Sequence, residues 1–435
     1  MLNYLSLSRH NIGNYVIIGL TLIPLLFWYP HANVSGVNNI FLAAGQVLGL
    51  MGSVLFSLNF MLSARLRFLE KYFGGLNRIY IIHHIIGAIA LIFLLYHPVM
   101  ISLFYLPLSV VAAAKILFAG PSNVPVFLGL TALAVLIIAL ILTFFIKLPY
   151  QIWKLSHKFL GLSLFLASLH IYLIPSTVSV SLPLRIYILG ISVVGIAAYL
   201  YRSIFDKLLI RKYKYKVEAV NKLGNDVTEA VMSPLEKPMN YLPGQFIFIN
   251  FESLGITRET HPFSLTSSPD TPQLSLGIKS SGDYTETIKL LKKDAVAEIE
   301  GPFGYFTFYR YGTNRQIWIA GGIGVTPFIS MARSLAMPNP YRIDMYYVVS
   351  TADEAVYQKE LEKIAAQISG FKLFPHFSKT MGRFNTESLA KSSPDFVGAD
   401  IFLCGPPPMM KSLKDQLKKV KVKGYRIHSE EFSID

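Results

Sequence analysis

Acidic side chains are nearly missing from the first half of this sequence. Between Met1 and Phe205 the only acidic residue is Glu70, although the 435-residue chain contains 26 aspartates and glutamates. Long apolar runs fill the same region, and hydrophobic residues make up 52% of the chain against 15% charged. This composition is too apolar for an ordinary soluble protein. We therefore expect a membrane domain over residues 1–210, followed by a soluble region.

Cysteine is equally scarce, because Cys404 is the only one in the chain. A single cysteine excludes a disulfide framework and an iron–sulfur cluster held by cysteines. The net charge of +14 would suit a nucleic-acid-binding protein. However, many basic residues flank the apolar runs, and no known nucleic-acid-binding motif is present. We expect no nucleic-acid partner and attribute the basic residues to orientation in the lipid bilayer.

Six apolar segments are long enough to cross a membrane, which takes about 20 residues. They are residues 14–30, 40–62, 78–104, 124–146, 155–174 and 182–204. Lysine and arginine are concentrated in the segments after the second, fourth and sixth runs, whereas Lys115 and Arg185 are the basic residues near the spans on the other side. Because basic loops stay in the cytoplasm, we expect a multi-pass protein of the cell membrane with both termini and the soluble region cytoplasmic.

Four histidines lie in the third and fifth apolar runs. His83 and His97 are 14 residues apart, and His157 and His170 are 13 apart. At a rise of 1.5 Å per residue these spacings are about 21 and 19.5 Å, so each run carries one histidine near each leaflet. The two runs have the same direction in the predicted topology. We therefore expect two pairs at matched depths, an inner pair of His83 and His157 and an outer pair of His97 and His170.

Paired imidazoles inside a helical bundle are able to hold haem iron from both sides. The sequence thus predicts two haem b groups, although membrane histidines also serve as helix-contact or proton-relay groups. His84 is a second candidate for the inner position of His83. At 100° per residue, 14 residues return to within about 40° of one helix face but 13 residues leave about 140°. The fifth span must therefore be distorted or strongly tilted.

The two inner histidines share a short pattern, His-x-x-x-Gly, which ends at Gly87 and Gly161. A glycine one turn after the histidine allows close approach of either a flat macrocycle or a neighbouring helix.

The soluble region changes its pattern near residue 313. From about Lys214, short alternating strands separated by turn residues predict a small antiparallel β-barrel. After Arg315, strands followed by glycine turns and helices predict a parallel α/β domain that binds a nucleotide. We place the domains at residues 1–210, 211–312 and 313–435.

Several stretches of the soluble region are suited to phosphate or flavin. In "HPFSLTSS" an aromatic residue and hydroxyls alternate along one strand, and "GDYTETIKLL" opens a helix with small residues that favour a pyrophosphate. The turns "GGIGVTP" and "CGPPPMM" follow strands, where open α/β sheets bind ligands. Each stretch alone is equally compatible with an edge strand, a capped helix or a proline-rich turn.

Taken together and in this order, five stretches resemble the ferredoxin-reductase-type flavin and nicotinamide module. They are "PGQF" (243–246), "HPFSLTS" (261–267), "GPFG" (301–304), "GGIGVTPF" (321–328) and "LCGPPPM" (403–409). Combined with six spans and paired histidines, nearly the whole chain resembles the NADPH oxidase and ferric reductase superfamily, and most closely its bacterial members. The resemblance implies a six-span helical membrane bundle, an antiparallel β-barrel FAD domain and a Rossmann-like α/β domain for NADPH or NADH.

The resemblance also implies roles for individual residues. FAD would contact His261, Pro262, Phe263, Ser264, Thr266, Gly282, Asp283 and Thr285. The nicotinamide nucleotide would contact Gly322, Gly324, Thr326, Cys404, Gly405 and Pro406. Three residues would take catalytic positions: Ser264 near the reactive edge of the flavin, Cys404 in the nicotinamide site, and Phe432 covering the flavin. The metal ligands would be His83, His97, His157 and His170.

The implied activity is electron transfer from cytosolic NAD(P)H through FAD and two haems to an acceptor outside. We favour dioxygen, reduced to superoxide by an NADPH oxidase, and keep a ferric-chelate reductase as the alternative. A third reading is a haem-free transporter or proton relay with a regulatory nucleotide domain. Since one chain would hold the whole route, no protein activator is required in principle. The choice between NADPH and NADH stays open, because Thr351 and Arg383 favour a 2′-phosphate whereas Asp353 and Glu354 repel it.

Overall fold

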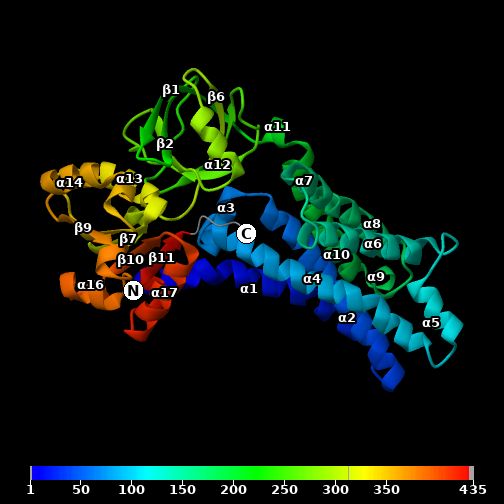
Figure 1. Ribbon diagram of the computed structural model, residues 1–435. Helices are drawn as coiled ribbons and strands as arrows, with labels where there is room; N and C mark the ends of the chain where they lie inside the picture. The colour runs from blue at the N-terminus through cyan, green and yellow to red at the C-terminus, as the bar shows by residue number, and fades with distance from the viewer. Residues whose placement is uncertain (1, 312, 431–435) are drawn as a thin grey trace. The chain divides into compact units, whose positions relative to one another are not determined.

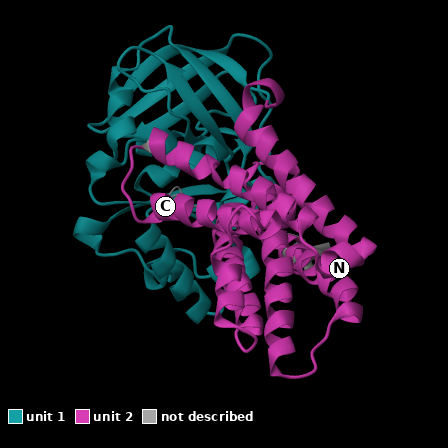
Figure 2. Ribbon diagram, turned by 90° about the vertical axis from the view of Figure 1, so that its right-hand side faces the viewer, with its two compact units in different colours: residues 1–7, 75–77, 211–435 teal, residues 8–74, 78–210 magenta. Residues whose placement is uncertain are grey.

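A computed structural model describes residues 2–311 and 313–430. The chain divides into two compact units (Figure 2). The first unit consists mainly of residues 8–74 and 78–210, and the second mainly of residues 211–430. Phe432, which the family resemblance assigns to a position over the flavin, lies outside the described residues.

The first unit is entirely helical in its regular structure (Figure 1). Its helices are α1 (Leu2–Trp28), α2 (Val37–Ser63), α3 (Arg67–Phe73), α4 (Leu76–Tyr105), α5 (Val110–Leu117), α6 (Val124–Phe144), α7 (Tyr150–Lys158), α8 (Leu160–Leu173), α9 (Thr177–Val180), α10 (Leu182–Tyr199) and α11 (Asp206–Leu209). Among the described residues, five helices are long and apolar enough to cross a membrane: Ile12–His31, Val37–Ser63, Leu76–Tyr105, Val124–Phe144 and Leu182–Ile204. Large apolar side chains such as Leu26, Phe145 and Ile186 are exposed on this unit, as lipid contact requires.

The fifth predicted span is divided into two helices. Helix α7 ends at Lys158 and α8 begins at Leu160, with Phe159 between them at φ −64° and ψ −14°. The N–H of Phe159 bonds back to the Ser156 carbonyl over 3.1 Å, a tighter turn than an α-helix makes. The expected single span 155–174 is therefore wrong in its first turns. The break supplies the distortion that the 13-residue histidine spacing demands.

The first part of the second unit is an antiparallel barrel. Its strands are β1 (Tyr213–Leu223), β2 (Val227–Pro234), β3 (Phe246–Glu252), β4 (His261–Ser264), β5 (Leu274–Lys279) and β6 (Val296–Phe303). They pair in the order β4-β3-β6-β1-β2-β5, and a bridge from Leu265 to Leu276 joins the two ends of this sheet. The short helix α12 (Asp283–Thr287) contributes Tyr284 to the barrel core.

The second part is a parallel α/β sheet. Its strands are β7 (Arg315–Gly321), β8 (Arg342–Val349), β9 (Phe371–Phe377), β10 (Asp400–Cys404) and β11 (Ile427–Glu430), and its helices are α13 (Thr326–Arg333), α14 (Gln358–Gln367), α15 (Ser378–Met381), α16 (Thr386–Ser392) and α17 (Pro407–Lys419). The strand order is β11-β10-β7-β8-β9, and all these pairs are parallel. The order reverses between β7 and β10, and such a switch point is where open sheets bind ligands. The predicted fold class is confirmed.

Candidate functional site

The outer histidines face each other inside the helical unit. The ring centroids of His97 on α4 and His170 on α8 are 6.4 Å apart, with the ring planes at 69°. A metal–imidazole bond is about 2 Å long, so two imidazoles on opposite sides of one ion have centroids roughly 6 Å apart. The two rings are therefore placed to hold one metal ion between them.

Each outer ring is anchored by a backbone carbonyl of the neighbouring helix. The Nδ1 atom of His97 lies 2.7 Å from the Gly45 oxygen, and that of His170 lies 2.7 Å from the Pro125 oxygen. A carbonyl only accepts, so Nδ1 carries the proton in both rings and donates it. Each Nε2 is thereby left as an electron-pair donor, which is the arrangement that metal-bound histidines adopt.

A glycine four residues after each anchoring carbonyl makes room for the ring. A Cβ on Gly49 would lie 2.7 Å from Nδ1 of His97, and a Cβ on Gly129 would lie 2.8 Å from Nδ1 of His170. Contacts this short do not occur with real Cβ atoms, so any larger residue would displace the imidazole. The same arrangement thus appears twice, once between α2 and α4 and once between α6 and α8.

A cavity of about 540 Å³ surrounds the outer pair. His97 and His170 are among its lining residues, together with mostly apolar side chains of α2, α4, α6 and α8. Gln46 also lines the cavity, and its amide oxygen accepts a 2.8 Å hydrogen bond from the indole N–H of Trp28. Cofactor pockets are typically about 300–1,000 Å³ and largely apolar. The cavity therefore has the size and lining of a cofactor site.

The inner histidines also have their Nδ1 atoms engaged, but by longer contacts. Nδ1 of His83 lies 3.2 Å from the Asn59 carbonyl, and Nδ1 of His157 lies 3.4 Å from the hydroxyl of Thr143. Thr143 gives its own proton to a carbonyl one turn earlier, so its oxygen accepts from His157. His84 has an exposed side chain, and within residues 2–311 and 313–430 it makes no comparable ring hydrogen bond. The structure thus favours His83 for the inner position.

Side chains of neighbouring helices fill the space beside the two glycines of the His-x-x-x-Gly pattern. A Cβ on Gly87 would lie 2.8 Å from the amide nitrogen of Asn59 on α2. A Cβ on Gly161 would overlap the ring of Tyr199 on α10. Of the two explanations that the sequence allowed, close helix approach is the one these contacts represent.

Strand β4 carries the residues that the sequence assigns to flavin. The hydroxyl of Ser264 is buried, and within the described part of the chain it has no hydrogen-bond partner. Buried polar groups are normally hydrogen-bonded, so a bound ligand would supply the missing partner of Ser264. A flavin ring at this strand fits that requirement. Pro262 and Phe263 are partly exposed beside it. The Thr266 hydroxyl is already bonded to Ser275 over 2.8 Å, so it is not presented to the same ligand.

His261 is held by two neighbours at the start of β4. Its ring stacks on Tyr284 with centroids 3.9 Å apart, and its Nε2 lies 3.1 Å from a Glu259 carboxylate oxygen. Burial raises the pKa of Tyr284, which therefore stays a neutral stacking platform at physiological pH. His261 thus lies against the helix whose first residues were assigned to the pyrophosphate.

The predicted pyrophosphate residues lie in the turn before and at the start of α12. Thr285 accepts hydrogen bonds of 2.9 Å from the N–H groups of both Ser281 and Gly282. Gly282 and Asp283 are exposed at this turn. The turn is therefore pre-formed, with two of its N–H groups directed to the side chain of Thr285.

The residues that the resemblance assigns to the nicotinamide nucleotide meet at the switch point of the α/β sheet. A Cβ on Gly324 would lie 2.5 Å from the Cys404 carbonyl oxygen, and one on Gly405 would lie 2.9 Å from Cα of Gly321. The turns after β7 and β10 therefore pack backbone against backbone, which only glycine allows. Gly322 adopts φ +54°, a second reason for glycine in this turn.

Three other predicted nucleotide residues differ in how they are presented. The Cys404 side chain is 1% exposed and belongs to the core of the α/β domain. The Thr326 hydroxyl donates to the Ile323 carbonyl over 3.1 Å, and Pro406 is exposed at the turn. Backbone groups of these turns, more than the side chain of Cys404, are thus available to a nucleotide.

Sequence reasoning did not find the groups that anchor the histidines. These are the carbonyls of Gly45, Asn59 and Pro125 and the hydroxyl of Thr143. Backbone carbonyls have no residue signature, so only Gly49 and Gly129 could have indicated them.

Three parts of the chain match known families. Residues 48–168 match the ferric reductase like transmembrane component, residues 212–305 an FAD-binding domain, and residues 318–415 an oxidoreductase NAD-binding domain.

Curated relatives match parts of the chain. The glycine betaine monooxygenase reductase subunit of Pseudomonas aeruginosa is 30% identical over 207 residues, covering 44% of this chain and 56% of that protein. Ferric reduction oxidase 8, mitochondrial, of Arabidopsis thaliana is 33% identical over 136 residues, covering 27% of this chain and 18% of that protein. The chain thus spans about half the length, or less, of these two relatives.

A solved structure is similar in fold. Flavohemoglobin from Malassezia yamatoensis has a TM-score of 0.51 at 19% identity, covering 81% of this chain and 98% of that one.

The three family matches follow one another along the chain in the order that the sequence motifs indicated. The chain therefore joins a ferric-reductase-like transmembrane domain to the FAD-binding and NAD-binding domains of an NAD(P)H-dependent oxidoreductase, the architecture of the NADPH oxidase and ferric reductase superfamily.

Proposed function

We propose that this protein is a transmembrane NADPH oxidase that moves electrons from cytosolic NAD(P)H to dioxygen outside the cell and forms superoxide. The observation that carries the proposal is the outer histidine pair, whose rings face each other at 6.4 Å across a cofactor-sized cavity. The family matches support electron transfer by FAD-binding and NAD-binding domains joined to a membrane domain.

The histidine pairs fit two b-type haems. All four Nδ1 atoms are engaged, so Nε2 of His97 and His170, and of His83 and His157, are the atoms that would hold the iron. When bound, FAD and the haems supply the redox chemistry, turning a two-electron donor into single electrons for the acceptor. The residues of the chain position these groups, and no side chain is needed as an acid or a nucleophile.

The lining of the outer cavity supports dioxygen as the acceptor. Among the described residues that line it, there is no aspartate, glutamate, lysine or arginine. Dioxygen is small and uncharged, so it would reach a group held in this cavity without bringing a charge into apolar surroundings, a cost that a charged ferric chelate would incur. A ferric-chelate reductase remains the second candidate, because one relative is described as a ferric reduction oxidase.

The orientation is part of the proposal. With the basic segments in the cytoplasm, electrons leave a cell whose interior is negative. This movement is favourable by about 2.3 kcal/mol per electron for each 100 mV. Both termini and the nucleotide domains would lie on the cytoplasmic side of the cell membrane.

The acceptor is tested with purified, haem-loaded protein, NADPH and no added iron. We expect reduction of cytochrome c that superoxide dismutase abolishes, since superoxide would carry the electrons. Reduction that appears only after adding a ferric chelate would support the reductase instead. Absence of reduced b-type absorbance bands with NADPH would contradict both enzymes and favour a haem-free transporter or proton relay.

A prediction follows for the glycine that accommodates the outer ring. Replacing Gly129 by alanine places a Cβ 2.8 Å from Nδ1 of His170 and pushes the ring off the Pro125 carbonyl. Loss of the hydrogen-bond partner of a metal-binding histidine, here the Pro125 carbonyl, typically weakens metal binding about 10- to 100-fold. We expect haem content to fall towards one per chain, measured by absorbance after detergent purification. Gly190→Ala is the matched control, because nothing lies within 4 Å of its added Cβ. Equal haem content in both variants would contradict the assignment.

A further inference from the structure

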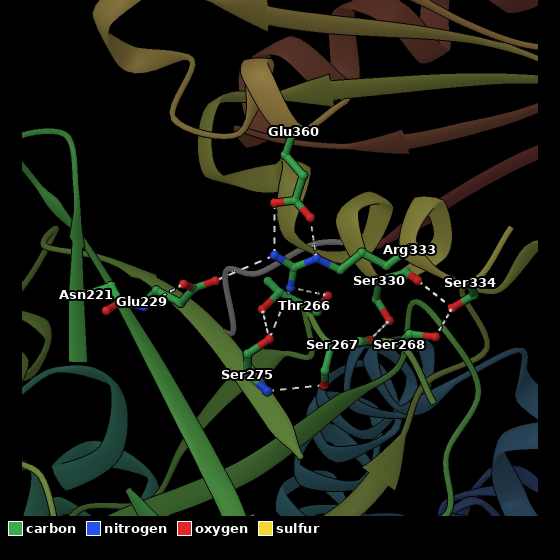
Figure 3. A network of polar contacts seen from close by, with 10 residues as sticks. All are labelled: Asn221, Glu229, Thr266, Ser267, Ser268, Ser275, Ser330, Arg333, Ser334 and Glu360. Atoms are coloured by element: carbon green, nitrogen blue, oxygen red, sulfur yellow. Dashed lines mark hydrogen bonds and ion pairs between the residues drawn. The ribbon is translucent and has the colours of Figure 1, made fainter. Parts of the chain in front are cut away.

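Arg333 lies where the flavin barrel meets the α/β domain (Figure 3). It is the last residue of α13, and its guanidinium forms a two-point contact with Glu360 of α14. Nε lies 2.6 Å from one carboxylate oxygen and Nη2 lies 2.9 Å from the other. The fork geometry of arginine matches a carboxylate in this way, so the plane of the guanidinium is fixed.

The same guanidinium contacts the barrel with its remaining nitrogen. Nη1 donates to the Thr266 carbonyl over 3.0 Å and to the Ser275 hydroxyl over 3.2 Å. Nη2 also lies 3.7 Å from Glu229 of β2. The Arg333 side chain is 24% exposed and that of Glu229 is 12% exposed, so these contacts are partly shielded from water.

Ser330 of α13 and Ser334, which directly follows the helix, support the contact on the same side. Ser330 donates to the Ser267 carbonyl over 2.7 Å, and the hydroxyls of Ser268 and Ser334 are 3.4 Å apart. Figure 3 shows these residues lying beside Arg333 between the two domains. The helix is thereby tied to the loop that follows β4.

Both ends of this connection lead to the nucleotide sites. Helix α13 begins at Thr326, directly after the glycine turn assigned to the nicotinamide nucleotide. Thr266 follows Ser264, the buried hydroxyl assigned to the flavin, by two residues. The network therefore joins the supports of the two sites through one short helix.

We propose that Arg333 is a positioning residue for hydride transfer, which holds the nicotinamide-binding turn at a fixed distance from the flavin strand. In that step one hydride, a proton with two electrons, passes from NAD(P)H to FAD, leaving NAD(P)⁺ and reduced flavin. A misplacement of about 1 Å far from the chemistry costs roughly 100-fold in rate. Arg333 contacts the supporting strand and helix, so its effect is on alignment more than on affinity.

The inference rests on the proposed function only for flavin reduction by NAD(P)H, not for the haems or the acceptor. The test is Arg333→Lys in the full chain, with flavin bleaching followed anaerobically after mixing with NADPH. Lysine keeps the charge but cannot form the planar fork. We expect the limiting rate to fall about 10- to 100-fold while the NADPH concentration for half-maximal rate changes less than about threefold.

Arg315→Lys is the matched control. The Arg315 side chain is 15% exposed and pairs with Asp344 and Asp395, and all three residues belong to the α/β domain. We expect this variant to lose thermal stability without loss of the limiting rate. The contrast separates alignment between domains from stability within one domain.

An unchanged limiting rate in FAD-loaded Arg333→Lys overturns the inference, as does an equal rate loss in Arg315→Lys. If Arg333→Lys does not retain FAD, Glu360→Gln is measured instead, because it weakens the same fork from the opposite side. It too must slow flavin bleaching, and an unchanged rate there counts against Arg333. The haem spectrum of the same samples tests the proposed function separately, since missing haem bands leave the bleaching measurement intact.

Discussion

Replacing His170 by alanine should remove one haem per chain and abolish acceptor reduction while leaving flavin reduction intact. His170 faces His97 at 6.4 Å, and its loss leaves one side of the outer site without an imidazole. The inner pair, held by Asn59 and Thr143, does not depend on this ring. We expect superoxide formation to fall about 100-fold or more, since electrons would lose their last carrier. Haem per chain is measured by absorbance, and flavin reduction by anaerobic bleaching with NADPH.

The matched control is His31→Ala. His31 ends the short 3₁₀-helix η1 (Tyr29–His31), is exposed, and is not among the residues that line the cavity. This variant should keep two haems and normal superoxide formation. An unchanged haem content in His170→Ala would contradict the outer site. Equal loss of flavin reduction and superoxide formation would contradict the separation of the two halves.

The approach of the two outer histidines was predictable because helix rise converts sequence spacing directly into distance. Spacings of 14 and 13 residues place His83 with His157 and His97 with His170, and the outer rings indeed face each other. The same arithmetic required a distorted fifth span, which the break at Phe159 provides. Rotation about a helix is harder to predict, because it depends on the neighbouring helix. The sequence alone therefore could not choose between His83 and His84, whereas the contact of His83 with the Asn59 carbonyl favours His83.

The nucleotide sites show the same division between pattern and packing. Period-two alternation and glycine turns predicted both soluble folds, and the turns after β7 and β10 do meet at the switch point. The alternation of residue types along the strand did not reveal that the Thr266 hydroxyl is hydrogen-bonded to Ser275. The contact of Arg333 with Glu360 joins residues 27 positions apart and depends on how two helices pack. No local pattern could have indicated it.

Replacing Gly324 by alanine should stop NAD(P)H from reducing the flavin. The new Cβ would lie 2.5 Å from the Cys404 carbonyl oxygen. The backbone fixes the positions of both atoms, so no change of side-chain rotamer relieves the contact. Relief requires the turns after β7 and β10 to separate, and a shift of about 1 Å costs roughly 100-fold in rate. Flavin bleaching with NADPH measures the loss, while dithionite should still reduce the haems because it bypasses this domain. Gly398→Ala is the control, since its added Cβ meets nothing within 4 Å. Normal bleaching in FAD-loaded Gly324→Ala would show that the nucleotide does not use these turns.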